Sequence, residues 1–189
     1  MLHRIIGCTV VFWFVVEGGF ANEHPLHLAW KMGDLRFTDW RYGSKFEEQQ
    51  INCVQFLGYV IEELLGRELS IHERDALMIQ NIRKVENLQR LVKRGDRRTK
   101  GVQYALVSMR RGKVIPPSKA RPGDFIQYWY KKEGVWLGHA AIIQEIQRER
   151  NKYCAYVFGA HESIDAIGVA GYQITLNDPM LKVYIVRFH

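Results

Sequence analysis

Residues 121–143 have the sequence RPGDFIQYWYKKEGVWLGHAAII, in which two apolar runs are separated by turn residues. Pro122-Gly123-Asp124 is the first turn signal, and residues 131–134 form the second. The runs at 125–130 and 135–146 have the length and the aromatic and β-branched content of strands. This stretch therefore predicts two consecutive strands joined by a short turn.

The chain on either side of this stretch differs in the spacing of its apolar residues. Further strands are predicted on the C-terminal side, at residues 152–159, 171–176 and 181–188. On the N-terminal side apolar residues recur every three or four positions, which predicts helices at residues 52–66, 70–94 and 101–111. Residues 22–50 predict a short helix and an irregular approach to the core. Helices followed by strands predict an α+β fold, with N-terminal helices packed on a C-terminal antiparallel sheet.

The composition fits one folded domain of ordinary size. The chain has 189 residues, of which 47% are hydrophobic and 25% are charged, as in soluble globular proteins. We expect residues 22–189 to form this domain, with residues 67–120 as a basic helical insertion.

The N-terminus has the pattern of an export signal. Arg4 precedes an apolar run at residues 5–16, and small residues follow up to Ala21, where a signal peptidase would cleave. The run is about a dozen residues, and a membrane span needs roughly 20. Cys8 precedes most of the apolar run, which argues against a lipidated cysteine. We expect residues 1–21 to be a signal peptide and the protein to be periplasmic or secreted; an uncleaved N-terminal anchor is the alternative.

The formal net charge of +7 stays with the domain, because residues 1–21 contain one base, Arg4, and one acid, Glu17. Residues 83–121 hold thirteen lysines and arginines but only two acids, Glu86 and Asp96. This excess favours an anionic partner. For an exported protein, a cell-wall polymer or an anionic membrane surface fits better than nucleic acid. A solvated basic surface without a partner is the alternative.

Cys53 lies in the first turn of the helix predicted at 52–66. Unpaired amide groups and the helix dipole stabilise a thiolate at such a position and lower its pKa. Asn52 can cap the helix, and the backbone N–H groups of this terminus can receive an oxyanion. The alternative is an ordinary core cysteine. We do not expect a disulfide with Cys154, which lies in a strand-like segment where a buried free thiol is common.

His139 is the candidate general base, because a titratable ring inside an apolar strand is costly unless it is used or hydrogen-bonded. Gly138 and Ala140 on either side leave room for close approach by a helix or a substrate. His161, at the end of the next strand, could orient the imidazole of His139, and Glu162 is its competitor. A core histidine and a loop histidine without a role are the alternatives.

A metal site is less well supported. His139 and His161 lack a second ligand at helical or strand spacing, apart from the adjacent His161-Glu162 pair, and His24 and His27 form an isolated pair. We therefore expect no metal and no cofactor.

Taken in order, these segments resemble the NlpC-type papain-like cysteine peptidases and amidases. The resemblance covers residues 40 to about 163 and rests on four motifs: Tyr42-Gly43, the helix start at residues 52–57, the Pro-Gly-Asp turn, and the strand at residues 138–143. The order of these motifs is that of the unpermuted members. The chain departs from the family pattern at Asn52, where an Asp is usual, and at Val54-Gln55, where Ser-Gly is usual.

The resemblance implies that Cys53 attacks an acyl carbonyl, that His139 cycles the proton, and that His161 is the third polar residue. Tyr42 would lie near the oxyanion. Family members commonly cleave the peptide stems of bacterial cell walls, so the resemblance implies peptidoglycan as the substrate. Two alternatives stay open: a catalytically silent module that binds cell wall or membrane, and a thioesterase or acyltransferase that uses the same dyad.

Overall fold

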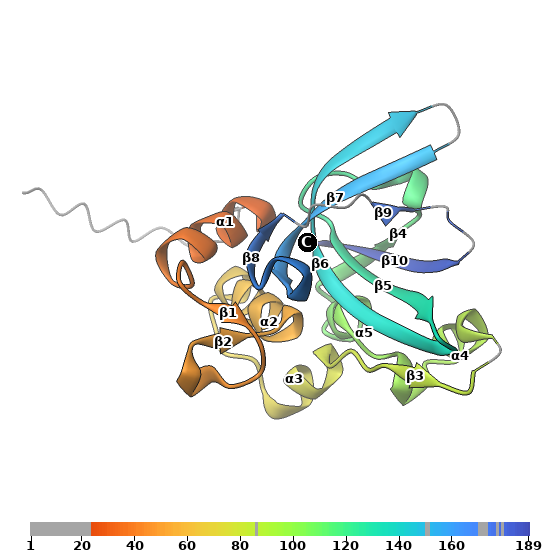
Figure 1. Ribbon diagram of the computed structural model, residues 1–189, viewed down its shortest axis with the longest axis horizontal. Coiled ribbons are helices and arrows are strands. Elements are labelled where there is room, and N and C mark those ends of the chain that lie inside the picture. Colours follow the sequence, from red (N-terminus) through yellow and green to blue (C-terminus); the bar gives the residue numbers. More distant parts are fainter. Residues whose placement is uncertain (1–23, 86, 150–151, 170–173, 177, 179) are drawn as a thin grey trace, which may run out of the picture.

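The computed structural model describes residues 24–189 except 86, 150–151, 170–173, 177 and 179. In it, N-terminal helices pack against a mostly antiparallel C-terminal β-sheet (Figure 1), which confirms the α+β fold. The predicted signal peptide at residues 1–21 lies outside the described residues.

The α-helices are α1 (Pro25–Leu35), α2 (Cys53–Leu65), α3 (Ile71–Leu77), α4 (Leu88–Lys93) and α5 (Val102–Ser108). The helices predicted at 52–66 and 101–111 are confirmed by α2 and α5, and the short helix predicted within 22–50 by α1. Helix α2 begins with a capping box, in which Asn52 Oδ1 accepts hydrogen bonds from the N–H groups of Val54 and Gln55. Gln55 Oε1 in turn accepts from the N–H of Asn52. The start of α2 is therefore fixed by side chains as well as by the backbone.

The single helix predicted at residues 70–94 is wrong. The structure has α3, then the short strand β3 (Ile82–Arg83), then α4. The cause is a pair of buried tryptophans on the sheet, because Trp129 Nε1 donates to the carbonyl of Gln80 and Trp136 Nε1 to that of Val85. Ile82 packs on both indoles. These tertiary contacts hold the chain extended where its apolar spacing alone predicts a helix.

The main sheet has the strand order β4-β10-β5-β6-β7-β8, with β3 paired to β6 and β9 to β7. Its strands are β4 (Gly112–Ile115), β5 (Phe125–Lys132), β6 (Val135–Glu149), β7 (Lys152–His161), β8 (Ala166–Val169), β9 (Ile174–Thr175) and β10 (Leu181–Phe188). Strands β5, β6, β7 and β10 confirm the sequence prediction. The strand predicted at 171–176 is seen as β9, and its residues 171–173 lie outside the described part. Strands β4 and β8 were not predicted, nor was the small parallel pair of β1 (Arg41–Tyr42) and β2 (Gln50–Ile51).

The two faces of the sheet bury different clusters. The face towards α1, α2, α3 and α5 forms the larger core, which includes Phe125, Ala140, Ile142, Phe158 and Ala160 from the sheet. The opposite face forms a second core around Ile126, Tyr128, Ala141 and Ile143. Leu77 and Leu106 also belong to the larger core. The segment predicted as an insertion at 67–120 therefore supplies part of the main core.

A buried ion pair holds the Pro-Gly-Asp turn that opens β5. Asp124, 1% exposed, accepts hydrogen bonds from Arg187 at 2.7 and 2.9 Å. Its Oδ2 also accepts from the N–H of Arg121, and Gly123 donates its N–H to the carbonyl of Ile143. Gly123 has φ +87, where the adjacent ring of His24 also leaves no space for a Cβ. The motif is thus required by the fold, because it joins β5, β6 and β10.

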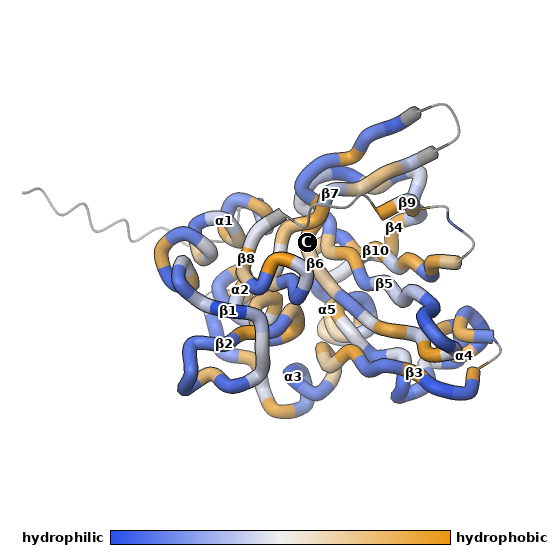
Figure 2. The backbone as a smooth tube through the Cα atoms, in the orientation of Figure 1, coloured by the Kyte–Doolittle hydropathy of each residue, from blue (hydrophilic) through white to orange (hydrophobic). Residues whose placement is uncertain are grey.

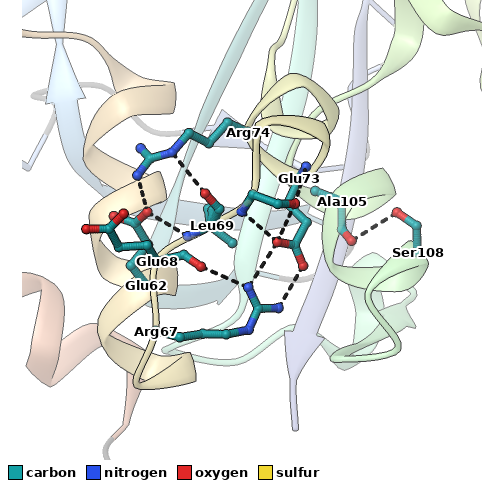
Figure 3. A network of polar contacts seen from close by, with 9 residues as sticks. Glu62, Arg67, Glu68, Leu69, Glu73, Arg74, Ala105 and Ser108 are labelled. Carbon is teal, nitrogen blue, oxygen red and sulfur yellow. Dashed lines mark hydrogen bonds and ion pairs between the residues drawn. The ribbon is translucent and has the colours of Figure 1, made fainter.

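A polar network joins α2 to α3 on the surface (Figure 3). Arg67 forms two hydrogen bonds to the carboxylate of Glu73, at 3.0 and 2.7 Å, and Arg74 pairs with Glu62 on α2. Glu62 also accepts from the N–H of Leu69. These contacts fix the sharp turn after α2, so that α3 packs back against the core.

Hydrophilic residues predominate on the part of β6 that projects beyond the body of the sheet (Figure 2).

Among the described residues, no helix combines the length and the apolar character that a membrane crossing requires.

Candidate active site

Cys53 is the first residue of α2, and its side chain is only 4% exposed. Burial raises the pKa of the thiol, while the N–H groups of Ala140 and Val54 and the Tyr42 hydroxyl oppose this rise. The expectation that the helix start lowers the pKa of Cys53 is therefore wrong for this structure, because desolvation outweighs the donors. The resting cysteine is a neutral thiol.

The sulfur of Cys53 lies beside β6 near the end of its paired register with β7. This register ends at Ile142 and Phe158, although β6 continues back to Val135 and β7 on to His161. Here the backbone N–H of Ala140 lies against the sulfur, and the Ala140 side chain packs in the same core as Cys53. The nucleophile candidate is thus in contact with the residue that follows His139.

His139 lies on the other face of β6 from Ala140, because side chains alternate along a strand. It pairs across the ladder with Tyr128, and the two ring centroids are 5.3 Å apart. Burial, followed by the nearby His161, lowers the pKa of His139 to about 3. Within the described residues its Nε2 atom is buried and has no hydrogen-bond partner. The ring is therefore neutral and can accept a proton.

His161 is the last residue of β7 and is 1% exposed. Its ring stacks on that of His139, with centroids 4.7 Å apart and planes inclined by 26°. Burial lowers the pKa of His161 to about 4, although the Val157 backbone opposes this. Within the described part of the chain, neither ring nitrogen of His161 has a partner of normal hydrogen-bond geometry. The structure brings the two histidines together by stacking, without the hydrogen bond that would orient His139 in the usual way.

Tyr42, on β1, connects the cysteine with the histidines. Its hydroxyl contacts Cys53, and burial together with this contact raises the pKa of Tyr42. The N–H of Tyr42 donates to Asp165 Oδ1 at 3.2 Å, which fixes β1 beside the residues that lead into β8. The hydroxyl is thus a protonated donor next to the sulfur, the position that the resemblance implies for an oxyanion contact.

A pocket of about 760 Å³ opens on the face of the sheet that carries both histidines. It is lined by residues of β1, β5, β6, β7, β9 and β10 and of the segments that connect the elements. The lining residues are Tyr42, Asn81, Tyr128, Tyr130, Lys131, Lys132, Leu137, Gly138, His139, His161, Glu162, Ser163, Ile174, Thr175, Asp178, Met180 and Leu181. Cys53 is absent from this lining. Tyr42 is the residue that touches both the pocket and the sulfur.

Several of these residues have no sequence signal. Asn81 accepts the N–H of Gly138 at 3.0 Å, and it comes from the segment predicted as a helix. Tyr128 belongs to a predicted strand and Lys132 to the predicted turn, and only the register of β5 shows that both share the face of His139. A period-two pattern assigns residues to faces, and the choice of face depends on packing that the sequence does not specify.

The remaining candidates are placed as follows. Glu162 follows His161 and lines the pocket near Tyr42, whose pKa it helps to raise. Cys53 and Cys154 are both buried and free, so no disulfide joins them. Among the described residues, no group of three His, Cys, Asp or Glu side chains could hold a metal ion.

Comparison with known proteins adds no family assignment. No protein-family model matches the sequence, and no curated protein matches it at a significant level of similarity.

Proposed function

We propose that this protein is a cysteine hydrolase that cleaves an amide bond, with Cys53 as the nucleophile and His139 as the general base. One observation carries the proposal: the Cys53 sulfur, at the capped start of α2, contacts the N–H of the residue that follows His139, beside a large pocket. The sulfur and its backbone donors lie on the α2 side of β6, and the His139 ring lies on the pocket side; Tyr42 connects the two sides, because it contacts the sulfur and also lines the pocket.

The proposed reaction begins from neutral partners. As the thiol sulfur of Cys53 forms a bond to the substrate carbonyl carbon, His139 takes the thiol proton and the carbonyl oxygen becomes an oxyanion. The backbone N–H of Cys53 and the Tyr42 hydroxyl are the candidate donors to this oxyanion. The carbon–nitrogen bond then breaks, His139 returns the proton to the leaving amine, and a thioester remains. Water, deprotonated by His139, releases the carboxylic acid and restores the thiol.

Burial sets the timing of proton transfer. It raises the pKa of Cys53 and lowers that of His139 to about 3, which disfavours a resting thiolate–imidazolium pair. Proton transfer is then favourable only when negative charge moves to the oxyanion, where the donors stabilise it. No hydrogen bond joins the two side chains among the described contacts, and such bonds often tighten only when substrate is bound.

The proposed substrate is the peptide stem of peptidoglycan. The support is the resemblance to NlpC-type peptidases in motif order, together with the signal-like N-terminus that predicts export to the periplasm or beyond. The cations of residues 83–121 are consistent with an anionic wall polymer or membrane surface, since all of them except Lys100 are exposed. They lie on several elements, including α4 and β4, and so do not belong to one helix.

One set of observations favours a second candidate, a catalytically silent binding module. The sulfur is buried, its pKa is raised, and Cys53 does not line the pocket. In this case the pocket or the exposed cations would bind cell wall or membrane, and Cys53 would be a core residue.

Digestion of peptidoglycan separates the two candidates. The purified protein, Cys53→Ala and His139→Ala are each incubated with peptidoglycan, and the released fragments are identified by mass. The hydrolase proposal expects new peptide termini only with the unaltered protein. Binding of all three proteins to the wall, without fragments from any of them, would support the silent module.

A further inference from the structure

The floor of the pocket changes character along the β5–β6 ladder. On the pocket face, His139 pairs with Tyr128, Leu137 with Tyr130, and Val135 with Lys132. An imidazole, an apolar and aromatic middle, and an ammonium group therefore follow one another along one face. At about 3.3 Å per residue, the four residue steps from His139 to Val135 span roughly 13 Å.

Two hydrogen-bond donors line the pocket beyond His139. Lys132, at the far end of the ladder, lines the pocket and is exposed, so its ammonium group can meet a ligand. Asn81 also lines the pocket, and its Oδ1 accepts the N–H of Gly138, next to His139, at 3.0 Å. Because a backbone N–H requires an acceptor, this bond fixes the carboxamide so that its NH₂ group is the part left for a ligand. The ammonium group suits a carboxylate, and the amide donor suits a carbonyl oxygen of a chain that leads to it.

The pocket lining holds other charged residues besides Lys132. Lys131 also lines the pocket, although it alternates to the opposite face of β5 and its Nζ lies 5.9 Å from the ring centroid of Trp136. Glu162, the acid near Tyr42, follows His161 at the far end of β7. The β5–β6 turn lies beside β3 and α4, away from β8 and β1 (Figure 1). Asp178, the other acid of the lining, lies before Leu181, which pairs with Tyr130. The Lys132 end therefore holds two lysines and one acid, and it is the more cationic end of the pocket.

We propose that Lys132 binds the terminal carboxylate of a short peptide whose chain extends along the pocket from His139 past Asn81. This inference rests on the proposed function, because the reaction places the scissile bond near His139. The separation of roughly 13 Å fits three or four residues of extended chain. The pocket would thus favour a peptide with a free C-terminus a few residues beyond the scissile bond.

Binding tests this inference without turnover. Full-length Cys53→Ala protein is titrated calorimetrically with tetraalanine and with tetraalanine amide, which differ only in the terminal carboxylate. We expect the acid to bind about tenfold more tightly than the amide, about 1.4 kcal/mol. Lys132→Gln should remove this difference, whereas Asn81→Leu should weaken both peptides and leave the difference in place. Lys113→Gln, an exposed lysine on the edge strand β4, should leave it unchanged.

Three results would overturn the inference: equal binding of acid and amide, no binding of either peptide at millimolar concentration, or a preference that Lys132→Gln retains. Thermal melting of each variant checks that the fold is intact. A Lys132-dependent preference in a protein that releases no wall fragments would keep the carboxylate site and reject the hydrolase. Fragment release without the preference would do the reverse.

Discussion

His161 stacks on His139 with ring centroids 4.7 Å apart, and among the described residues neither of its ring nitrogens has a partner of normal hydrogen-bond geometry, although the Val157 backbone lies close enough to raise its pKa. A buried, unsatisfied polar atom is costly in a folded protein. The stack therefore holds His139 by packing while it leaves polar atoms unpaired beside the pocket. This arrangement differs from the orienting hydrogen bond that the family resemblance implies, and it makes separate predictions for stability and for activity.

Replacement of His161 by Phe should stabilise the protein. The variant keeps an aromatic ring on His139 and removes two unpaired nitrogens, so we expect the free energy of unfolding to rise by about 1–2 kcal/mol. Denaturant unfolding measures this change, with His72→Phe on the exposed surface of α3 as the matched control. A decrease in stability for His161→Phe would mean that the nitrogens are hydrogen-bonded in solution.

The same variant separates packing from hydrogen bonding in catalysis. If stacking positions His139, His161→Phe should keep kcat within about tenfold of the unaltered protein, because Phe retains the aromatic pair. Such a pair contributes roughly 0.5–1.5 kcal/mol. His161→Ala should lose more. A higher kcat for His161→Asn than for His161→Phe would instead show that a hydrogen bond from residue 161 orients the base.

Stability should fall as the pH is lowered below 6.5. The pKa values of His139 and His161 are lowered to about 3 and 4, from an ordinary value of 6.5. Between these values the unfolded chain binds more protons than the folded protein, so each histidine removes stability as the pH drops, by at most about 1.4 kcal/mol per pH unit. Above pH 6.5 both are neutral and contribute no slope.

Thermal melts between pH 7 and pH 4.5 measure this dependence. His161→Phe should reduce the slope, since one of the two groups is removed. The paired acids Glu73 and Asp96 have pKa values lowered to about 2 from ordinary values of 4.5 and 3.8, so their own loss of stability falls mostly below this pH range. An unchanged slope in His161→Phe would show that other groups are responsible.

Tyr42→Phe should weaken the nucleophile without removing it. The Tyr42 hydroxyl lowers the pKa of Cys53, so its loss should raise that pKa further, as measured by the pH profile of alkylation. If the hydroxyl also stabilises the oxyanion, kcat should fall by about 10²–10³. Tyr104→Phe, an exposed tyrosine on α5, is the matched control. Unaltered activity in Tyr42→Phe would exclude the oxyanion role.

Arg187→Gln should destabilise the fold much more than a surface change. It would leave the carboxylate of Asp124, 1% exposed, without its cation, at a cost of about 3 kcal/mol. Arg98→Gln, which breaks an exposed pair with Asp96, should cost less than about 1 kcal/mol. Denaturant unfolding compares the two. Similar small losses would show that the Pro-Gly-Asp turn does not depend on the ion pair.

Local pattern was enough to predict α2, α5 and the four long strands, because their apolar spacing agrees with the tertiary packing. It failed at residues 70–94, where indole donors from Trp129 and Trp136 hold the chain extended. It also missed β4 and β8, whose pairing partners, β10 and β7, lie far away or beyond a turn in the sequence. Such pairings depend on long-range contacts that periodicity does not contain.

The candidate site shows the same division. Tyr42, His139 and His161 line one pocket, Cys53 contacts Tyr42 from the other side of β6, and the capping of α2 follows from Asn52. The burial of Cys53 could not be predicted from the sequence, and it raises the pKa that the helix start was expected to lower. The faces of β6 also required the structure, since they place His139 on the pocket and Ala140 against the cysteine.

The most direct test of Cys53 as the nucleophile is a search for a covalent intermediate on its sulfur. The protein is quenched with acid during turnover of soluble peptidoglycan fragments and digested, and its peptides are identified by mass. We predict an acyl group on the peptide that contains Cys53, which hydroxylamine removes. Cys154→Ala should form it as well, whereas Cys53→Ala should form no adduct and release no product. Equal product release by Cys53→Ala would contradict the assignment of Cys53 as the nucleophile.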